Sequence, residues 1–178
     1  MAVPFTIARA GSTISANRTS LLSWRFVLSR PAHWIALLGG VGLIRFAPGS
    51  FGTLAAFPLH FLFTSTLSTY AHLALLAALF VIGIWASGRT AHDLGVPDHG
   101  GIVFDETVAF LLVLFFTPAD RLWQAFAFLL FRLFDIFKPQ PIRHFDRSLH
   151  GGFGVMFDDL LAAGYTLLLL AVAKALID

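Results

Sequence analysis

The feature that most constrains this chain is a long stretch without charge. No Asp, Glu, Lys or Arg occurs between Arg45 and Arg89. A helix needs about 20 apolar residues to cross a bilayer, so this stretch is long enough for two crossings. Its most polar part is residues 66–70, which indicates a turn. We therefore predict a membrane-crossing helical hairpin with arms at residues 53–67 and 71–86.

The composition favours a membrane protein and excludes several other classes. Apolar residues make up 57% of the chain and charged residues only 12%, whereas soluble domains carry about 25% charged residues. So apolar a chain is also not expected to be disordered. The absence of cysteine excludes thiol nucleophiles, thiolate metal sites and disulfides. A net charge of +2 does not indicate a nucleic-acid partner, so the expected partner is the membrane.

Three later segments, 107–117, 122–137 and 160–177, are apolar but short or interrupted by charges. Each is near the lower length limit for a span, and a core helix explains it equally well. Lys138 should end the second segment, because a residue before proline avoids the α region. Residues 31–44 are rich in glycine, so a short re-entrant or interfacial helix fits them as well as a span does. The expected fold is all-α, with a single multi-helix integral membrane domain.

The N-terminal residues 1–30 differ from the rest, since they contain four Arg and no acid. Arg25 interrupts their apolar run, which argues against a cleaved secretory signal. A mitochondrial presequence has a similar composition, but we favour a basic arm that rests on anionic lipid headgroups. We therefore divide the chain into an arm, residues 1–30, and a helical membrane domain, residues 31–178.

If each segment from residue 53 onward crosses once, most basic residues lie in loops on one face of the membrane. Basic loops stay in the cytoplasm, so this face is expected to be cytosolic. Acidic residues cluster at predicted helix ends on the same face. Asp105 and Glu106 open segment 107–117, Asp135 closes segment 122–137, and Asp158 and Asp159 open segment 160–177.

Any one of these acids could be a helix cap, where the helix dipole stabilises a carboxylate. If they converge, their repulsion must be relieved by protonation, by Arg and Lys, or by a divalent cation. Hard oxygen ligands suit Mg²⁺, which usually combines one or two carboxylates with substrate phosphate oxygens. We therefore expect a subset of them to bind metal in a site of phosphoryl-transfer type.

A phosphate group would also need hydrogen-bond donors and cations. The glycine-rich residues 47–53 could turn backbone N–H groups toward an anion, although a capped turn with Ser50 as N-cap explains them too. Lys138 and Arg143 could hold either the substrate or ordinary headgroups. His99 is the best-placed candidate for a proton carrier, and a solvated loop histidine is the simpler interpretation.

Four motifs in this order resemble the phosphatidylglycerophosphatase A family: APGSFGTL at 47–54, IVFDE at 102–106, FDIFKPQPI at 134–142 and GGFGVMFDDLLAAG at 151–164. The resemblance implies an Mg²⁺-dependent phosphatase of the bacterial inner membrane, with its active-site loops in the cytosol. It would convert phosphatidylglycerophosphate to phosphatidylglycerol and inorganic phosphate during phospholipid biosynthesis. The family often has glycine where this chain has Ala109, which leaves the carboxylates in place.

By motif position, the resemblance implies a role for each of a set of residues. The catalytic acids would be Asp105, Glu106, Asp135, Asp158 and Asp159; the metal ligands would be Asp105, Glu106, Asp158 and Asp159; and the substrate would be held by Ser50, Thr53, Lys138 and Arg143. A small ion or metabolite transporter and a non-catalytic membrane subunit are the alternatives.

Overall fold

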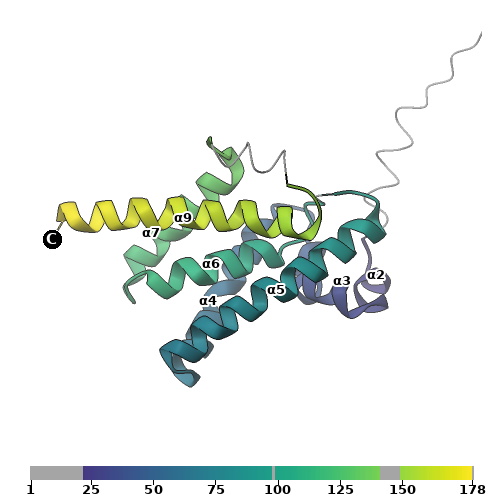
Figure 1. Ribbon diagram of the computed structural model, residues 1–178, viewed down its shortest axis with the longest axis horizontal. Coiled ribbons are helices and arrows are strands. Elements are labelled where there is room, and N and C mark those ends of the chain that lie inside the picture. The colour runs from purple at the N-terminus through teal and green to yellow at the C-terminus, as the bar shows by residue number, and fades with distance from the viewer. Residues whose placement is uncertain (1–21, 98, 141–148, 178) are drawn as a thin grey trace, which may run out of the picture.

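The fold is described for residues 22–97, 99–140 and 149–177 of a computed structural model, and these residues form helices without any strand (Figure 1). The all-α prediction is confirmed. In chain order the elements are α2 (Trp24–Ser29), α3 (Pro31–Ala36), the 3₁₀ helix η1 (Leu38–Leu43), α4 (Pro48–Thr66), α5 (Thr69–Leu94), α6 (Phe104–Phe116), α7 (Arg121–Phe137) and α9 (Gly151–Ile177).

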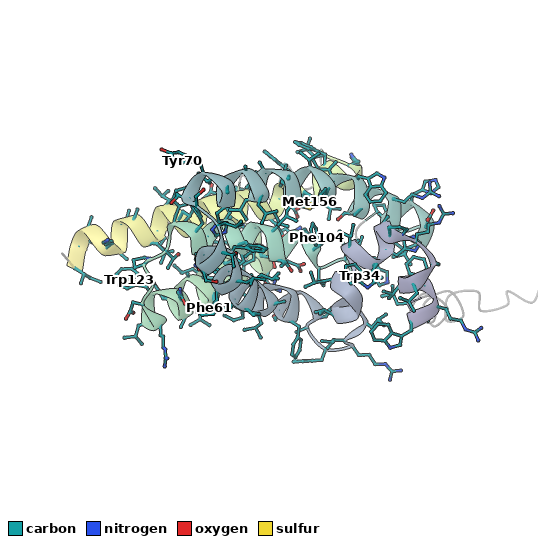
Figure 2. The ribbon with its side chains drawn as sticks, turned by 90° about the horizontal axis from the view of Figure 1, so that it is seen from below. Trp34, Phe61, Tyr70, Phe104, Trp123 and Met156 are labelled. Carbon is teal, nitrogen blue, oxygen red and sulfur yellow. The ribbon has the colours of Figure 1, made fainter. Side chains whose placement is uncertain are left out.

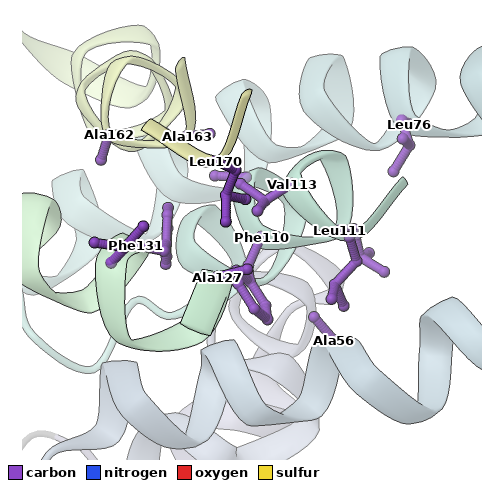
Figure 3. Packing of buried hydrophobic residues seen from close by; sticks show 13 residues of the cluster. Ala56, Leu76, Phe110, Leu111, Val113, Ala127, Phe131, Ala162, Ala163 and Leu170 are labelled. Atoms are coloured by element: carbon purple, nitrogen blue, oxygen red, sulfur yellow. The ribbon is translucent and has the colours of Figure 1, made fainter. Parts of the chain in front are cut away.

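The short helix α6 is the centre of the fold. It has 13 residues and packs against α4, α5, α7 and α9. Phe110 is fully buried and Leu111 nearly so, in a core to which α4, α5, α7 and α9 also contribute side chains (Figure 3). Segment 107–117, which the sequence left open between a span and a core helix, is therefore a core helix. Its side chains are apolar because they pack against other helices of the protein.

The predicted hairpin is present as α4 and α5, joined by Leu67 and Ser68. The Ser68 hydroxyl caps α5 by accepting a hydrogen bond from the Ala71 N–H at 3.3 Å. The two arms then separate, because α4 packs mainly on α6 while α5 packs mainly on α9 (Figure 1). Helix α5 also continues past the predicted end at residue 86 as far as Leu94. Gly95 ends it in the left-handed conformation, at φ 65°.

The last helix begins earlier than predicted. We expected Asp158 and Asp159 to open it after a glycine-rich loop, and this expectation is wrong. Helix α9 starts at Gly151, so both acids lie well inside the helix. A Cβ atom on Gly152 would lie only 1.8 Å from the carbonyl oxygen of Ile84 in α5. Gly152 therefore allows α9 to pack closely on α5.

The other predicted ends agree better with the structure. Helix α7 ends at Phe137, and Lys138 follows it in the left-handed conformation just before Pro139. Residues 31–44 contain two short helices, α3 and η1, with positive φ angles at Gly39 and Gly40. They are too short to span a bilayer, which removes one of the two interpretations that the sequence left open.

Among the described helices, α5 and α9 are long and apolar enough to cross a membrane, with 26 and 27 residues. Helix α4, the predicted first arm, is not among them. Its polar residues and Pro58 interrupt the apolar run. Many large apolar side chains are exposed. Among the aromatic residues, Trp34 lies toward one end of the molecule, and Tyr70 and the partly buried Trp123 lie toward the other (Figure 2). Tryptophan and tyrosine favour the two interfaces of a bilayer.

Replacing Gly152 with Ala should destabilise the fold, because the new methyl group would collide with the backbone of α5. Overpacking of this kind costs about 1–3 kcal/mol in free energy of unfolding. The measurement is thermal unfolding of the purified protein in detergent. The matched control is Gly164→Ala in the same helix, where an added Cβ meets nothing within 4 Å. Equal melting temperatures for the two variants would contradict the close α5–α9 contact.

Candidate functional site

Three carboxylates meet where the N-terminus of α6 lies against α9. Asp105, Glu106 and Asp159 each offer one oxygen, and these oxygens lie within 4.8 Å of one another. Asp105 is 6% exposed and Asp159 is 4% exposed. Asp105 and Glu106 are in the first turn of α6, where the helix dipole favours negative charge. Asp159 lies inside α9 and away from its N-terminus, so the dipole of its own helix does not stabilise its negative charge in this way.

The start of α4 forms the neighbouring wall of the site. A Cβ atom on Gly49 would lie 2.1 Å from Glu106 Oε1, so only glycine allows this approach. The Thr107 hydroxyl donates to the Gly52 carbonyl at 2.9 Å and ties α6 to α4. The expected N-cap role of Ser50 is wrong. The N-cap is Ala47, at φ 45°, and Pro48 is the first helical residue, where its missing N–H costs nothing.

A largely buried arginine, which was not among the predicted site residues, connects these parts. Arg132 Nη1 lies 2.7 Å from Asp135 Oδ2 and 3.7 Å from Glu106 Oε1. The same nitrogen donates to Thr53 Oγ1 at 3.3 Å. Thr53 in turn donates to the Gly49 carbonyl at 2.9 Å, so its hydroxyl is held inside the protein. The available sequence signal was the spacing of Arg132 and Asp135, three residues apart on one helix.

Asp158 points to a different partner from its neighbour Asp159. It forms an ion pair with Lys138, the residue that ends α7. The three-carboxylate group therefore contains three of the four predicted metal ligands, and Asp158 faces a cation. Of the predicted substrate-binding residues, Ser50 is half-buried on α4, and Arg143 lies outside the described residues.

Burial and neighbouring negative charges disfavour the ionised form of a carboxyl group in this site. Burial, and then the negative charges of Asp159 and Asp135, raise the pKa of Glu106 to about 8. Glu106 Oε2 and Asp159 Oδ2 are buried and have no hydrogen-bond partner within residues 22–97, 99–140 and 149–177. Buried oxygens of this kind are costly unless something binds them. A hard divalent cation fits this donor set.

All five predicted acids line a single cavity of about 230 Å³, together with Lys138. They come from three helices, α6, α7 and α9, that are far apart in the sequence. The structure thus brings the acids together as the sequence predicted. The fold and this cavity define the class as an all-helical protein with a buried carboxylate site at one end of the helix bundle.

Comparison with known proteins identifies the family. The model of the family Phosphatidylglycerophosphatase A matches residues 34–174. Phosphatidylglycerophosphatase A of Haemophilus influenzae is 44% identical over 142 residues, which are 79% of this chain and 87% of that protein. The Escherichia coli protein of the same name is 39% identical over 151 residues, 84% of this chain and 87% of that one. The chain belongs to the phosphatidylglycerophosphatase A family and is a phosphatase, a phosphoric monoester hydrolase.

A third relative carries a different name. A protein of Bacteroides thetaiotaomicron named "Putative phosphatidylinositol-3-phosphatase" is 36% identical over 157 residues, 83% of this chain and 98% of that protein. No solved structure matches the chain significantly. Membership of the family, with two apolar helices of spanning length, indicates a membrane protein.

Replacing Arg132 with Gln should destabilise the protein, because Asp135 and Glu106 would lose their common cation. Breaking a buried ion pair from one side costs about 3–5 kcal/mol, and Arg132 retains slight exposure, so we expect about 2–4 kcal/mol. The measurement is thermal unfolding in detergent, with Arg25→Gln as a control for the loss of an exposed arginine. Adding Asp135→Asn should recover part of the loss. A double variant no more stable than Arg132→Gln would show that the pair is not coupled.

Proposed function

We propose that this chain hydrolyses the terminal phosphate of phosphatidylglycerophosphate in an Mg²⁺-dependent reaction, and releases phosphatidylglycerol and inorganic phosphate. This would be a step of bacterial phospholipid biosynthesis, at the cytosolic face of the inner membrane. The observation that carries the chemistry is the group of three carboxylate oxygens within 4.8 Å, two of whose residues also present buried oxygens without partners. The names of the Haemophilus influenzae and Escherichia coli relatives support the substrate.

Asp105, Glu106 and Asp159 are the proposed metal ligands, and Asp158 is a further ligand only if it exchanges Lys138 for the ion. Mg²⁺ bound by these residues would neutralise phosphoryl oxygens and lower the pKa of a water molecule. Asp105 and Glu106 are held for this task by the buried helix α6. Asp159 is held by the close packing of α9 on α5.

Other residues of the cavity have separate proposed tasks. Lys138 lines it and can donate hydrogen bonds to phosphate oxygens. Asp135 lines the cavity and forms an ion pair with Arg132, and its carboxylate could accept a hydrogen bond or a proton from the attacking water. Through their contacts, Arg132 and Thr53 fix the positions of Asp135 and Glu106 relative to the start of α4. Ser50 and Arg143 complete the proposed contacts to the substrate.

The name of the third relative refers to another lipid but leads to the same kind of bond. A phosphatidylinositol 3-phosphate headgroup and a phosphatidylglycerophosphate headgroup both carry a phosphomonoester on a polyol. In both, a phosphodiester joins this polyol to the lipid. The proposed site therefore acts on a monoester at the outer end of a lipid headgroup.

The transporter alternative expects acids along a path through the bundle. The acids described here line one cavity of about 230 Å³, where the N-terminus of α6 and the C-terminus of α7 meet α9 (Figure 1). No observation favours transport, and a non-catalytic role leaves the buried carboxylate oxygens unexplained.

Replacing Asp105 or Asp159 with Asn should lower phosphate release from phosphatidylglycerophosphate by about a hundredfold or more, because even residues behind metal ligands contribute about 10–100-fold. The assay measures inorganic phosphate released by purified protein, with and without EDTA, and EDTA should abolish release by the wild type. Asp120→Asn is the matched control, because Asp120 caps the other end of α7 and asparagine caps equally well.

Two results would contradict the proposal. One is wild-type turnover in both the Asp105→Asn and the Asp159→Asn variants, with the fold intact by circular dichroism. The other is full activity of the wild-type protein in EDTA, which would remove the need for a divalent cation.

A further inference from the structure

A second cavity, of about 970 Å³, lies beside the acidic one. Gly100 lines both cavities. Pro48 lines the larger cavity, while the next residue, Gly49, contacts Glu106 of the acidic site. The backbone at Gly100 and the backbone at residues 48–49 therefore lie between the two cavities.

The larger cavity differs from its neighbour in charge. Among the described residues that line it there is no acid; Arg45 is the charged residue among them, and His99 is another lining residue. The Arg45 side chain is exposed and forms no ion pair with any described residue. Three other cations differ from Arg45 in being paired: Arg132 with Asp135, Lys138 with Asp158, and Arg89 with Asp93. Arg45 is thus available to an anion that enters the cavity.

The segment that carries Arg45 is braced against the segment that leads to the acids. A Cβ atom on Gly42 would lie 1.9 Å from the Gly101 carbonyl oxygen, so the two backbones are in direct contact. The Gly101 N–H donates to His99 Nδ1 at 3.0 Å, which fixes this turn. The Val103 N–H donates to the Ala36 carbonyl at 3.0 Å and secures the other side. The position of Arg45 is therefore coupled to that of the acidic site.

We propose that the larger cavity is a phosphodiester subsite in which Arg45 binds the anion, an inference that rests on the proposed function. The substrate carries the monoester to be cleaved and, one glycerol unit away, the diester that joins its headgroup to the lipid. A diester has a single negative charge, so one guanidinium is a sufficient partner. Trp24, 60% exposed, also lines the cavity, and tryptophan is a residue that favours the membrane interface.

The two neighbouring cavities then have different roles in binding and hydrolysis. The acidic cavity determines which bond is hydrolysed. The Arg45 cavity determines which headgroups are bound, because it favours a monoester that is one polyol away from a phosphodiester. Phosphodiesters of the surrounding lipids offer the same chemistry, so the test must distinguish them from the substrate.

The test compares Arg45→Gln with the wild type in dodecyl maltoside micelles that contain no phospholipid other than the one added. We expect the KM for dioctanoyl phosphatidylglycerophosphate to rise about tenfold, the effect of one hydrogen bond to a charged group, while kcat changes less than twofold. The dissociation constant of dioctanoyl phosphatidylglycerol, which has the diester but no monoester, should rise by the same factor in calorimetry. Inhibition by inorganic phosphate should not change.

The matched control is Arg25→Gln, which removes an exposed arginine next to Trp24 that does not line the cavity. The proposal is overturned if Arg45→Gln behaves like this control. It is also overturned if inhibition by inorganic phosphate weakens as much as binding of phosphatidylglycerol, or if the effect occurs only when bulk phospholipid is present. Absence of phosphate release by the wild type would instead refute the proposed function, and the calorimetry would still test the subsite.

Discussion

The site depends on carboxylates that are held close together where water is largely excluded. Repulsion between like charges grows as the local dielectric falls, so this arrangement works against folding. It persists because α6, which carries Asp105 and Glu106, is surrounded by four other helices and cannot shift away from α9. Arg132 compensates part of the charge from α7. Packing of the apolar core therefore supplies the free energy that holds the polar site together.

Much of the fold could be predicted from the sequence because helix signals are local. Ser68 caps α5, and Lys138 before Pro139 ends α7, at positions that the sequence indicates. The convergence of the acids could also be predicted, since consecutive antiparallel helices return the chain to the same side. These predictions use the positions of charged residues and of helix-ending residues, and the sequence gives both directly.

The predictions that failed concern contacts between distant segments. Paired glycines such as Gly151 and Gly152 are also typical of loops, so the sequence alone does not show that Gly152 forms a helix contact. Small residues allow helix backbones to approach closely, and here this moves the start of α9 well before Asp158. Arg132 was missed for a similar reason, because its pairing with Glu106 of α6 depends on how two helices pack. The role of such residues becomes evident only when the tertiary structure shows which helices are in contact.

Helix α7 shows how one element connects the lipid environment with the site. Leu122, Leu129 and Ile136 form an exposed apolar stripe along one side. Arg132 and Asp135 lie on the same helix and are largely withdrawn from solvent at the acidic cavity. A lipid that lies along the stripe would have its headgroup near the end of α7, next to Lys138.

The charge balance of the acidic cavity limits what can bind there. Asp105, Glu106, Asp135, Asp158 and Asp159 face one lysine in its lining, with Arg132 behind them. A phosphomonoester brings further negative charge, so it would be repelled by the empty carboxylate group. Protonation of Glu106, whose pKa is about 8, relieves part of this charge. Under the proposed function, a bound cation would neutralise more of it and would favour binding of the phosphate as well as the chemistry.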